Sequence, residues 1–160
     1  MDSGLDVSWN NANPVSWSFW VKPNNVVDSS AGILGKIYPG WEWAFYQSGA
    51  AVHMVYWDAW GRHANGMDAD WSSVLTVGQW IHLVYTWNGS TSRFYADGAL
   101  KITHTATNPS INQNRTNNVM IGGHIYVWGD KFFKGLIDEV RIYNRALSDA
   151  EIKALYEATK

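Results

Sequence analysis

Tryptophan is the residue type whose number and placement most suggest a function in this sequence. The chain has 160 residues and 11 of them are tryptophan. An indole that is left exposed is seldom without purpose, and its flat face suits the C–H groups of a sugar ring while polar neighbours bind the hydroxyl groups. Some tryptophans flank turns or loops and not apolar runs: Trp41, Trp57, Trp60, Trp71 and Trp128. These tryptophans beside turns and loops predict a carbohydrate ligand.

Two segments place such tryptophans beside hydrogen-bonding side chains. Residues 57–63 (WDAWGRH) and 126–131 (YVWGDK) each join aromatic and charged residues without a clear period, which favours surface loops. The predicted ligand-binding residues are Trp41, Trp57, Trp60, Arg62, His63, Tyr126 and Trp128. The alternative is that several of these rings pack beneath loops as small cores. An uncharged glycan is the simpler ligand, although Arg62 with Lys131 would also suit an acidic sugar.

Other side chains with chemical potential do not form a recognisable catalytic or zinc motif. A glycosidase needs two carboxylates about 5–9.5 Å apart, whereas Asp138 and Glu139 are adjacent and would point to opposite faces of a regular strand. The five histidines are scattered, without a cysteine or a helical spacing that would indicate zinc. The sequence therefore predicts a binding module, not an enzyme.

Composition excludes several further classes of function. The chain has no cysteine and a formal net charge of -2, and its basic residues form no run that would follow a phosphate backbone. No apolar stretch reaches the roughly 20 residues of a membrane helix. We therefore expect neither nucleic acid nor a membrane as partner.

The elements that must position these residues are mostly short strands. Apolar and aromatic runs alternate with Gly, Asn, Pro and Ser turns, a pattern typical of an antiparallel sandwich. The expected strands are 15–22, 33–37, 43–46, 52–57, 80–87, 93–96, 99–102, 119–123 and 135–143. Asn88-Gly89 and Asp97-Gly98 have the chemistry of hairpin turns. Ser148 and Glu151 form a capping box, which predicts a short C-terminal helix.

Five segments in order carry a family resemblance: SFWVKP (18–23), ILGK (33–36), GQWIHL (78–83), YADG (95–98) and GLIDEVRIYNRALS (135–148). Together they make the chain similar to the laminin-G-like jelly-roll domains of the concanavalin A-like lectin/glucanase superfamily, with a resemblance to the carbohydrate-binding modules of that group. The resemblance implies one all-β domain over residues 1–160, a two-sheet antiparallel β-sandwich (jelly roll) with a short C-terminal helix. It also implies that Trp20 and Trp80 anchor the core.

The resemblance adds expectations about metal, partner and location. Similar domains commonly hold a structural Ca²⁺, and Asp138 is the position that would bind it, with Asp2, Asp6 or Asp28 as weaker co-ligands. The alternative for Asp138 is a carboxylate held by loop amides or paired with Arg141 or Arg145. The Glu-x-Asp-x-x-Glu motif of the related hydrolases is absent from the sequence.

The resulting prediction is a non-catalytic module that binds a polysaccharide or oligosaccharide by tryptophan stacking and hydrogen bonds. We expect it to be extracellular, as part of a larger secreted protein. A protein-adhesion module or a structural laminin-G-like module remains the alternative, because one fold hosts many functions.

Overall fold

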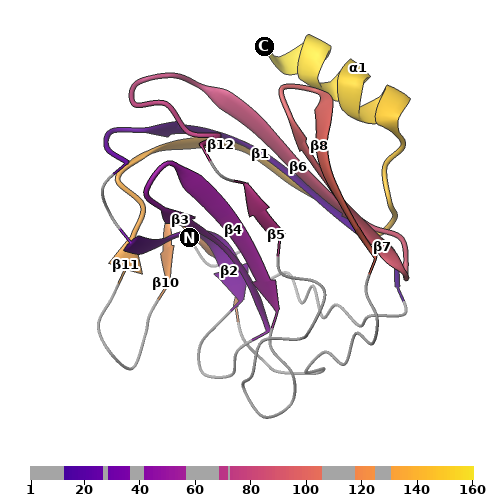
Figure 1. Ribbon diagram of the computed structural model, residues 1–160, viewed down its shortest axis with the longest axis horizontal. Coiled ribbons are helices and arrows are strands. Elements are labelled where there is room, and N and C mark those ends of the chain that lie inside the picture. Colours follow the sequence, from indigo (N-terminus) through magenta and orange to yellow (C-terminus); the bar gives the residue numbers. More distant parts are fainter. Residues whose placement is uncertain are drawn as a thin grey trace.

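Two sheets pack face to face in the computed structural model (Figure 1), and their strands are antiparallel except for the parallel pair of β11 (Lys131–Phe132) and β2 (Ser29–Lys36). The structure describes residues 13–26, 29–36, 42–56, 69–71, 73–105, 118–124 and 131–160. Sheet A has the strand order β12-β1-β6-β7-β8. Its strands are β1 (Val15–Pro23), β6 (Ile81–Trp87), β7 (Thr91–Ala96), β8 (Ala99–Thr105) and β12 (Gly135–Tyr143). The predicted all-β sandwich is confirmed.

Sheet B has the strand order β10-β11-β2-β3-β4-β5, with β9 also paired to β2. Its strands are β2 (Ser29–Lys36), β3 (Trp43–Ser48), β4 (Ala51–Tyr56), β5 (Ala69–Trp71), β9 (Met120–Ile121), β10 (Gly123–His124) and β11 (Lys131–Phe132). β5 was not expected, because residues 58–70 have no alternating pattern and a three-residue strand is fixed by its partner β4.

The core between the sheets is built from alternate residues of the strands, as the period of two requires. Trp17, Phe19 and Val21 of β1 are at most 1% exposed and face the partner sheet. Trp17 contacts Trp43 of β3, with ring centroids 5.1 Å apart. Burial of aromatic rings from both sheets dominates the stabilisation of a sandwich of this size.

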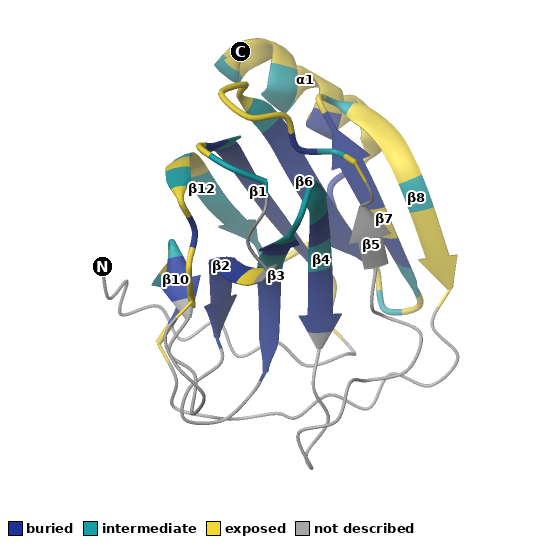
Figure 2. Ribbon diagram, turned by 60° about the vertical axis from the view of Figure 1, so that its left-hand side comes forward, coloured by how far each residue is buried: buried dark blue, intermediate teal, exposed yellow. Residues whose placement is uncertain are grey.

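The outer face of sheet A is covered by helix α1 (Asp149–Thr159), which lies beyond the sheet in Figures 1 and 2. Ser148 caps the helix, and the predicted capping box with Glu151 is present. Ile152 of the helix is fully buried against Val84 and Tyr95 of the sheet. The helix therefore gives the polar side of sheet A a second, smaller core.

Local turn chemistry also follows the sequence. Asp97 and Gly98 both have positive φ (51° and 73°), as the tight β7–β8 hairpin requires. Asn88 closes the β6–β7 turn, where its Oδ1 accepts hydrogen bonds from the backbone N–H groups of Ser90 and Thr91.

The two predicted core tryptophans of the resemblance differ in outcome. Trp20 is buried, but under helix α1 and not between the sheets, where its Nε1 donates to Thr159 Oγ1 (3.0 Å). The prediction for Trp80 is wrong, because this side chain is 41% exposed and precedes the first residue of β6. Gly78, with φ of 74°, turns the chain just before it, and its N–H donates to the carbonyl oxygen of Pro23.

Strand β8 is one of the two edge strands of sheet A, and among the described residues it pairs only with β7. Six of its seven residues are exposed and Ile102 is half-buried. Its pairing with β7 contains an irregularity between Phe94 and Tyr95, which bends the edge. No helix among the described residues is long and apolar enough to cross a membrane.

Candidate functional site

The predicted ligand-binding residues all lie outside the described residues: Trp41, Trp57, Trp60, Arg62, His63, Tyr126 and Trp128. The same holds for the predicted calcium co-ligands Asp2, Asp6 and Asp28. These assignments stay predictions. The structure does show the strand ends from which several of these segments depart, and it describes Asp138 completely.

Three strand ends of sheet B lie side by side. Lys36 of β2 is paired with Trp43 of β3, and Trp43 is paired with Tyr56 of β4. Segment 37–41 begins after Lys36, and segment 57–68 begins after Tyr56. The antiparallel register therefore attaches the segments that carry Trp41, Trp57 and Trp60 at one end of sheet B.

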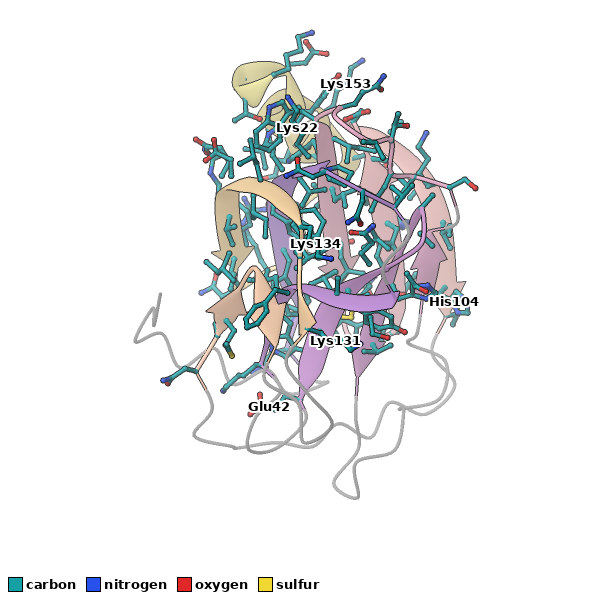
Figure 3. All side chains as sticks on the ribbon, turned by 90° about the vertical axis from the view of Figure 1, so that its left-hand side faces the viewer. Lys22, Glu42, His104, Lys131, Lys134 and Lys153 are labelled. Atoms are coloured by element: carbon teal, nitrogen blue, oxygen red, sulfur yellow. The ribbon has the colours of Figure 1, made fainter. Side chains whose placement is uncertain are left out.

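A buried ion pair closes this end of the sheet. Lys36 Nζ lies 3.3 Å from Glu42 Oε1, and their side chains are 0% and 2% exposed. The backbone N–H of Glu42 also donates to the carbonyl oxygen of Lys36 (3.0 Å). Opposite charges are tolerated in a protein interior when they are paired. The pair thus fixes the two ends of segment 37–41 to each other, at the end of the sandwich opposite Lys22 and Lys153 (Figure 3).

The outer face of sheet B carries a stacked aromatic pair. Tyr46 of β3 and His53 of β4 are cross-strand partners, and their rings are parallel within 8° at a centroid distance of 4.9 Å. Both are half-buried, whereas their neighbours Phe45 and Met54 point into the core. The pair offers a ring face together with a phenol and an imidazole, the groups that bind a sugar by stacking and hydrogen bonds.

Small residues lie beside this pair on the same face. Gly35, Ala44 and Val55 are aligned across β2, β3 and β4. A Cβ atom on Gly35 would lie 3.1 Å from the Cβ of Ala44, so the position accepts little more than hydrogen. Ala44 and Val55 are only 1% and 3% exposed and form a small buried cluster with Tyr46 packed against it. The part of this face that a ligand could reach is therefore at the aromatic pair.

Asp138 lies in β12 beside an irregularity of the sheet. Ser18 of β1 is paired with Arg141 and Trp20 is paired with Asp138, so two residues of β12 stand opposite Phe19 alone. Glu139 within this bulge has φ of 50°. A non-glycine residue keeps a left-handed conformation only where its surroundings enforce it, and such strain gathers at functional sites.

The bulge overturns one expectation from the sequence. Adjacent residues of a regular strand point to opposite faces, but Asp138 and Glu139 border the same pocket. Asp138 Oδ1 accepts the backbone N–H of Glu139 (2.8 Å). Arg141 pairs with Glu139 and Arg145 pairs with Glu151. The structure thus favours backbone hydrogen bonding over either predicted arginine pair for Asp138.

Within the described residues, no three Asp, Glu or His side chains gather as a metal site. A calcium ion at Asp138 would therefore take its other ligands from main-chain oxygens or from residues outside the described ranges. Calcium accepts irregular cages of carboxylate and carbonyl oxygens, so Asp138 fits as one ligand of such a cage. The calcium site stays a prediction.

Two site features were missed at the sequence level. The strand alternation that buries Trp43 and Phe45 also turns Tyr46 outward, and the tight turn at Gly49 sets the register that brings His53 to it. The alternation of β3 and the turn at Gly49 are both visible in the sequence and would predict this pair. Trp80 gives no such signal, because it continues the apolar run 81–87 and the sequence predicts one inner strand over 80–87.

The geometry agrees with the comparisons to known proteins. The family described as the concanavalin A-like lectin/glucanases superfamily matches residues 4–153. The chain belongs to this superfamily. The resemblance in the sequence is thereby confirmed, together with the jelly-roll fold that it implied. No curated protein matches the chain.

Solved structures with the same fold include bacterial toxin domains. The binding domain of botulinum neurotoxin serotype D has a TM-score of 0.73 and 17% identity, over 94% of this chain and 39% of that chain. A serotype D ligand-binding domain in complex with N-acetylneuraminic acid has a TM-score of 0.73 and 17% identity, over 97% of this chain and 38% of that chain. The serotype G binding domain has a TM-score of 0.71 and 17% identity, over 95% of this chain and 38% of that chain. This superfamily member thus spans about two fifths of those chains, and the likeness shows a shared fold.

Proposed function

We propose that the domain is a non-catalytic carbohydrate-binding module that holds a polysaccharide at the partly exposed aromatic pair on the outer face of sheet B. The stacked pair of Tyr46 and His53 carries the proposal, because it presents an aromatic surface and polar atoms on that face. The tryptophans predicted at the adjacent strand ends would extend this surface. Membership of a lectin and glucanase superfamily supports a glycan as the ligand class.

The module would act outside the cell as part of a larger secreted protein, where it tethers its parent to insoluble glycan. Two observations support a neutral ligand over an acidic one. The chain has no excess of basic residues, and Lys36, a cation at the row of strand ends, is already paired with Glu42. The serotype D domain binds N-acetylneuraminic acid, so an acidic sugar belongs in the test.

Affinity electrophoresis in gels that contain neutral polysaccharides, with a sialylated glycoprotein as a further gel, tests the proposal. Tyr46→Ala, Trp60→Ala and Trp128→Ala should each weaken retardation about tenfold, because loss of one stacking ring costs on the order of 1–2 kcal/mol. Tyr46→Phe keeps the ring and should retain most of the binding. Leu100→Ala is the matched control, since Leu100 is exposed on the remote edge strand β8.

Unretarded migration of the unmodified domain in every gel would overturn the glycan proposal. A protein-adhesion module would then be the reading to pursue. It would need a contact area of about 800 Å² on each partner.

A further inference from the structure

We propose that the domain has a second, independent sugar site, which takes one neutral hexose ring in a pocket beside Trp80. The pocket has a volume of about 300 Å³ and is lined by Trp20, Trp80, Asp138, Glu139, Thr159 and Lys160. This volume is at the lower end of the range of small-molecule sites, which suits one ring and not a chain. We call it the Trp80 pocket.

Separate parts of the chain build this pocket. Trp20 comes from β1, Asp138 and Glu139 come from the bulge in β12, and Thr159 and Lys160 come from the end of α1. The start of α1 is held at β7 by Tyr95, whose hydroxyl donates to Asp149 (2.7 Å), while its end is held at β1 by Trp20. In Figure 2 the C-terminal end of α1 accordingly lies above β1 and β12.

The walls of the pocket are held rigidly. Trp20 packs against His82 with the two rings tilted by 34°, and it stacks on Tyr156 (centroid distances 5.1 and 5.8 Å). Its Nε1 donates to Thr159 Oγ1. Trp80 is held through its backbone, because the turn before it is bonded to Pro23 at Gly78. The Trp80 residue nevertheless stays 41% exposed, whereas Trp17, Trp20, Trp43 and Trp87 are buried. An exposed indole on a held backbone, beside a hollow, is a surface on which a sugar ring can stack.

The charges around the pocket favour an uncharged ligand with hydroxyl groups. Glu139 is paired with Arg141, and Lys160 is paired with Glu157 while its Nζ lies 5.7 Å from the centre of the Tyr156 ring. The remaining carboxylate, Asp138, is exposed and can only accept hydrogen bonds. It suits the hydroxyl donors of a sugar. The carboxylates would repel an anionic ligand, and the Lys160 ammonium would repel a cationic one.

The Trp80 pocket is distinct from the surface proposed above. Trp20 and Asp138 belong to sheet A and α1 borders the pocket, whereas Tyr46 and His53 lie on the outer face of sheet B. Glu42, at the strand ends of sheet B, lies at the opposite end of the molecule from Lys22, which follows Trp20 and Val21 in β1 (Figure 3). One ligand ring at each site would make the module bivalent for a glycan network.

A titration followed by the indole N–H signals of ¹⁵N-labelled protein tests this site. The probes are the methyl glycosides of glucose, galactose and mannose, added in a chelating buffer so that Asp138 carries no metal. We expect at least one probe to shift the Trp80 signal, identified by its loss in Trp80→Phe, with saturation at millimolar concentration. Trp80→Ala should abolish the accompanying shift of the Trp20 signal, and Asp138→Asn should weaken it about tenfold.

Two controls separate this site from the surface on sheet B. Tyr46→Ala should leave the Trp80 titration unchanged, and so should Leu100→Ala. The second-site proposal is wrong if no probe gives a saturable shift of Trp80 in the unmodified protein. It is also wrong if the sugar response survives Trp80→Ala but disappears in Tyr46→Ala, a result that would leave the proposed function intact. A response to tetramethylammonium alone would likewise overturn a sugar site in favour of a cation.

Discussion

The imidazole of His82 lies beneath helix α1, where Ser18 Oγ is 2.8 Å from its Nε2. Tyr156 stacks on the imidazole ring, and Trp20 contacts it at a tilt. Burial lowers the pKa of His82 to about 4, and Arg141 adds to this effect while Asp97 opposes it. The native state thus favours the neutral ring. The unfolded chain takes up a proton near pH 6.5, so stability is complete above that pH and falls between pH 6.5 and about 4.

Replacement of His82 by Gln should remove this part of the acid sensitivity. We expect the melting temperature of the unmodified domain to decline from pH 6.5 to 4 more steeply than that of His82→Gln, although the variant is less stable at pH 7. The contribution of Glu151 to stability can be separated from that of His82. The hydrogen bond from Arg145 lowers the pKa of Glu151 to about 2, so the stability that Glu151 provides is lost only below pH 4.5. Parallel melting curves of both proteins over this pH range would contradict the assignment.

At the residue scale, the sequence indicated which face of a strand a tryptophan occupies but not what covers that face. Trp17 and Trp20 belong to opposite faces of β1, as alternation predicts. Whether Trp20 is exposed depends on α1, which begins more than 120 residues later in the chain. The outward turn of Trp80 depends on the hydrogen bond between Gly78 and Pro23, which no local pattern shows.

At the element scale, strand β12 begins where the chain comes closest to β1. A Cβ atom on Gly135 would clash with the carbonyl oxygen of Lys22 and would lie 2.6 Å from Cε1 of Phe133. Gly135→Ala should therefore destabilise the domain by about 1–3 kcal/mol, as overpacking of a fixed backbone does. Leu136→Ala on the same strand should change stability by less than about 0.5 kcal/mol, since Leu136 is 54% exposed. Urea unfolding followed by tryptophan fluorescence measures both, and equal effects would refute the steric argument.

Elements with local signals were predictable and those fixed by distant partners were not. A few neighbouring residues are enough to determine the capping box at Ser148, the hairpin at Asp97 and the long strand β1. β5 and β11 were not expected, and they exist because β4 and β2 accept them as partners. The expected strand 119–123 is divided instead into β9, which pairs with β2, and β10, which pairs with β11. The bulge at Glu139 is of the same kind, since it depends on the register between β1 and β12. This is why the pocket at Asp138 could not be foreseen.

At the scale of the whole molecule, the predicted calcium ion would act through linkage to folding. A metal ion that binds only the folded state adds about 2.7 kcal/mol to the free energy of unfolding when its concentration is 100 times the dissociation constant. Calcium saturation should thus raise the melting temperature by about 5–10 °C for a domain of this size, and a chelator should reverse the rise. Asp138→Asn should abolish the response while Asp149→Asn retains it. An identical melting temperature with chelator and with calcium would contradict the predicted calcium site.

Under the proposed function, many copies of the domain would crowd onto one fibre, and the edge strand β8 bears on how they would behave there. Adsorption to an insoluble polymer raises local concentration, and an open strand would then invite neighbouring sandwiches to join into a continuous sheet. Lys101 in the middle of β8 and the bend where β8 meets β7 work against that association, as charges and bulges do on other exposed edges. The domain would therefore coat a surface densely as separate units, with its aromatic faces left available to ligand.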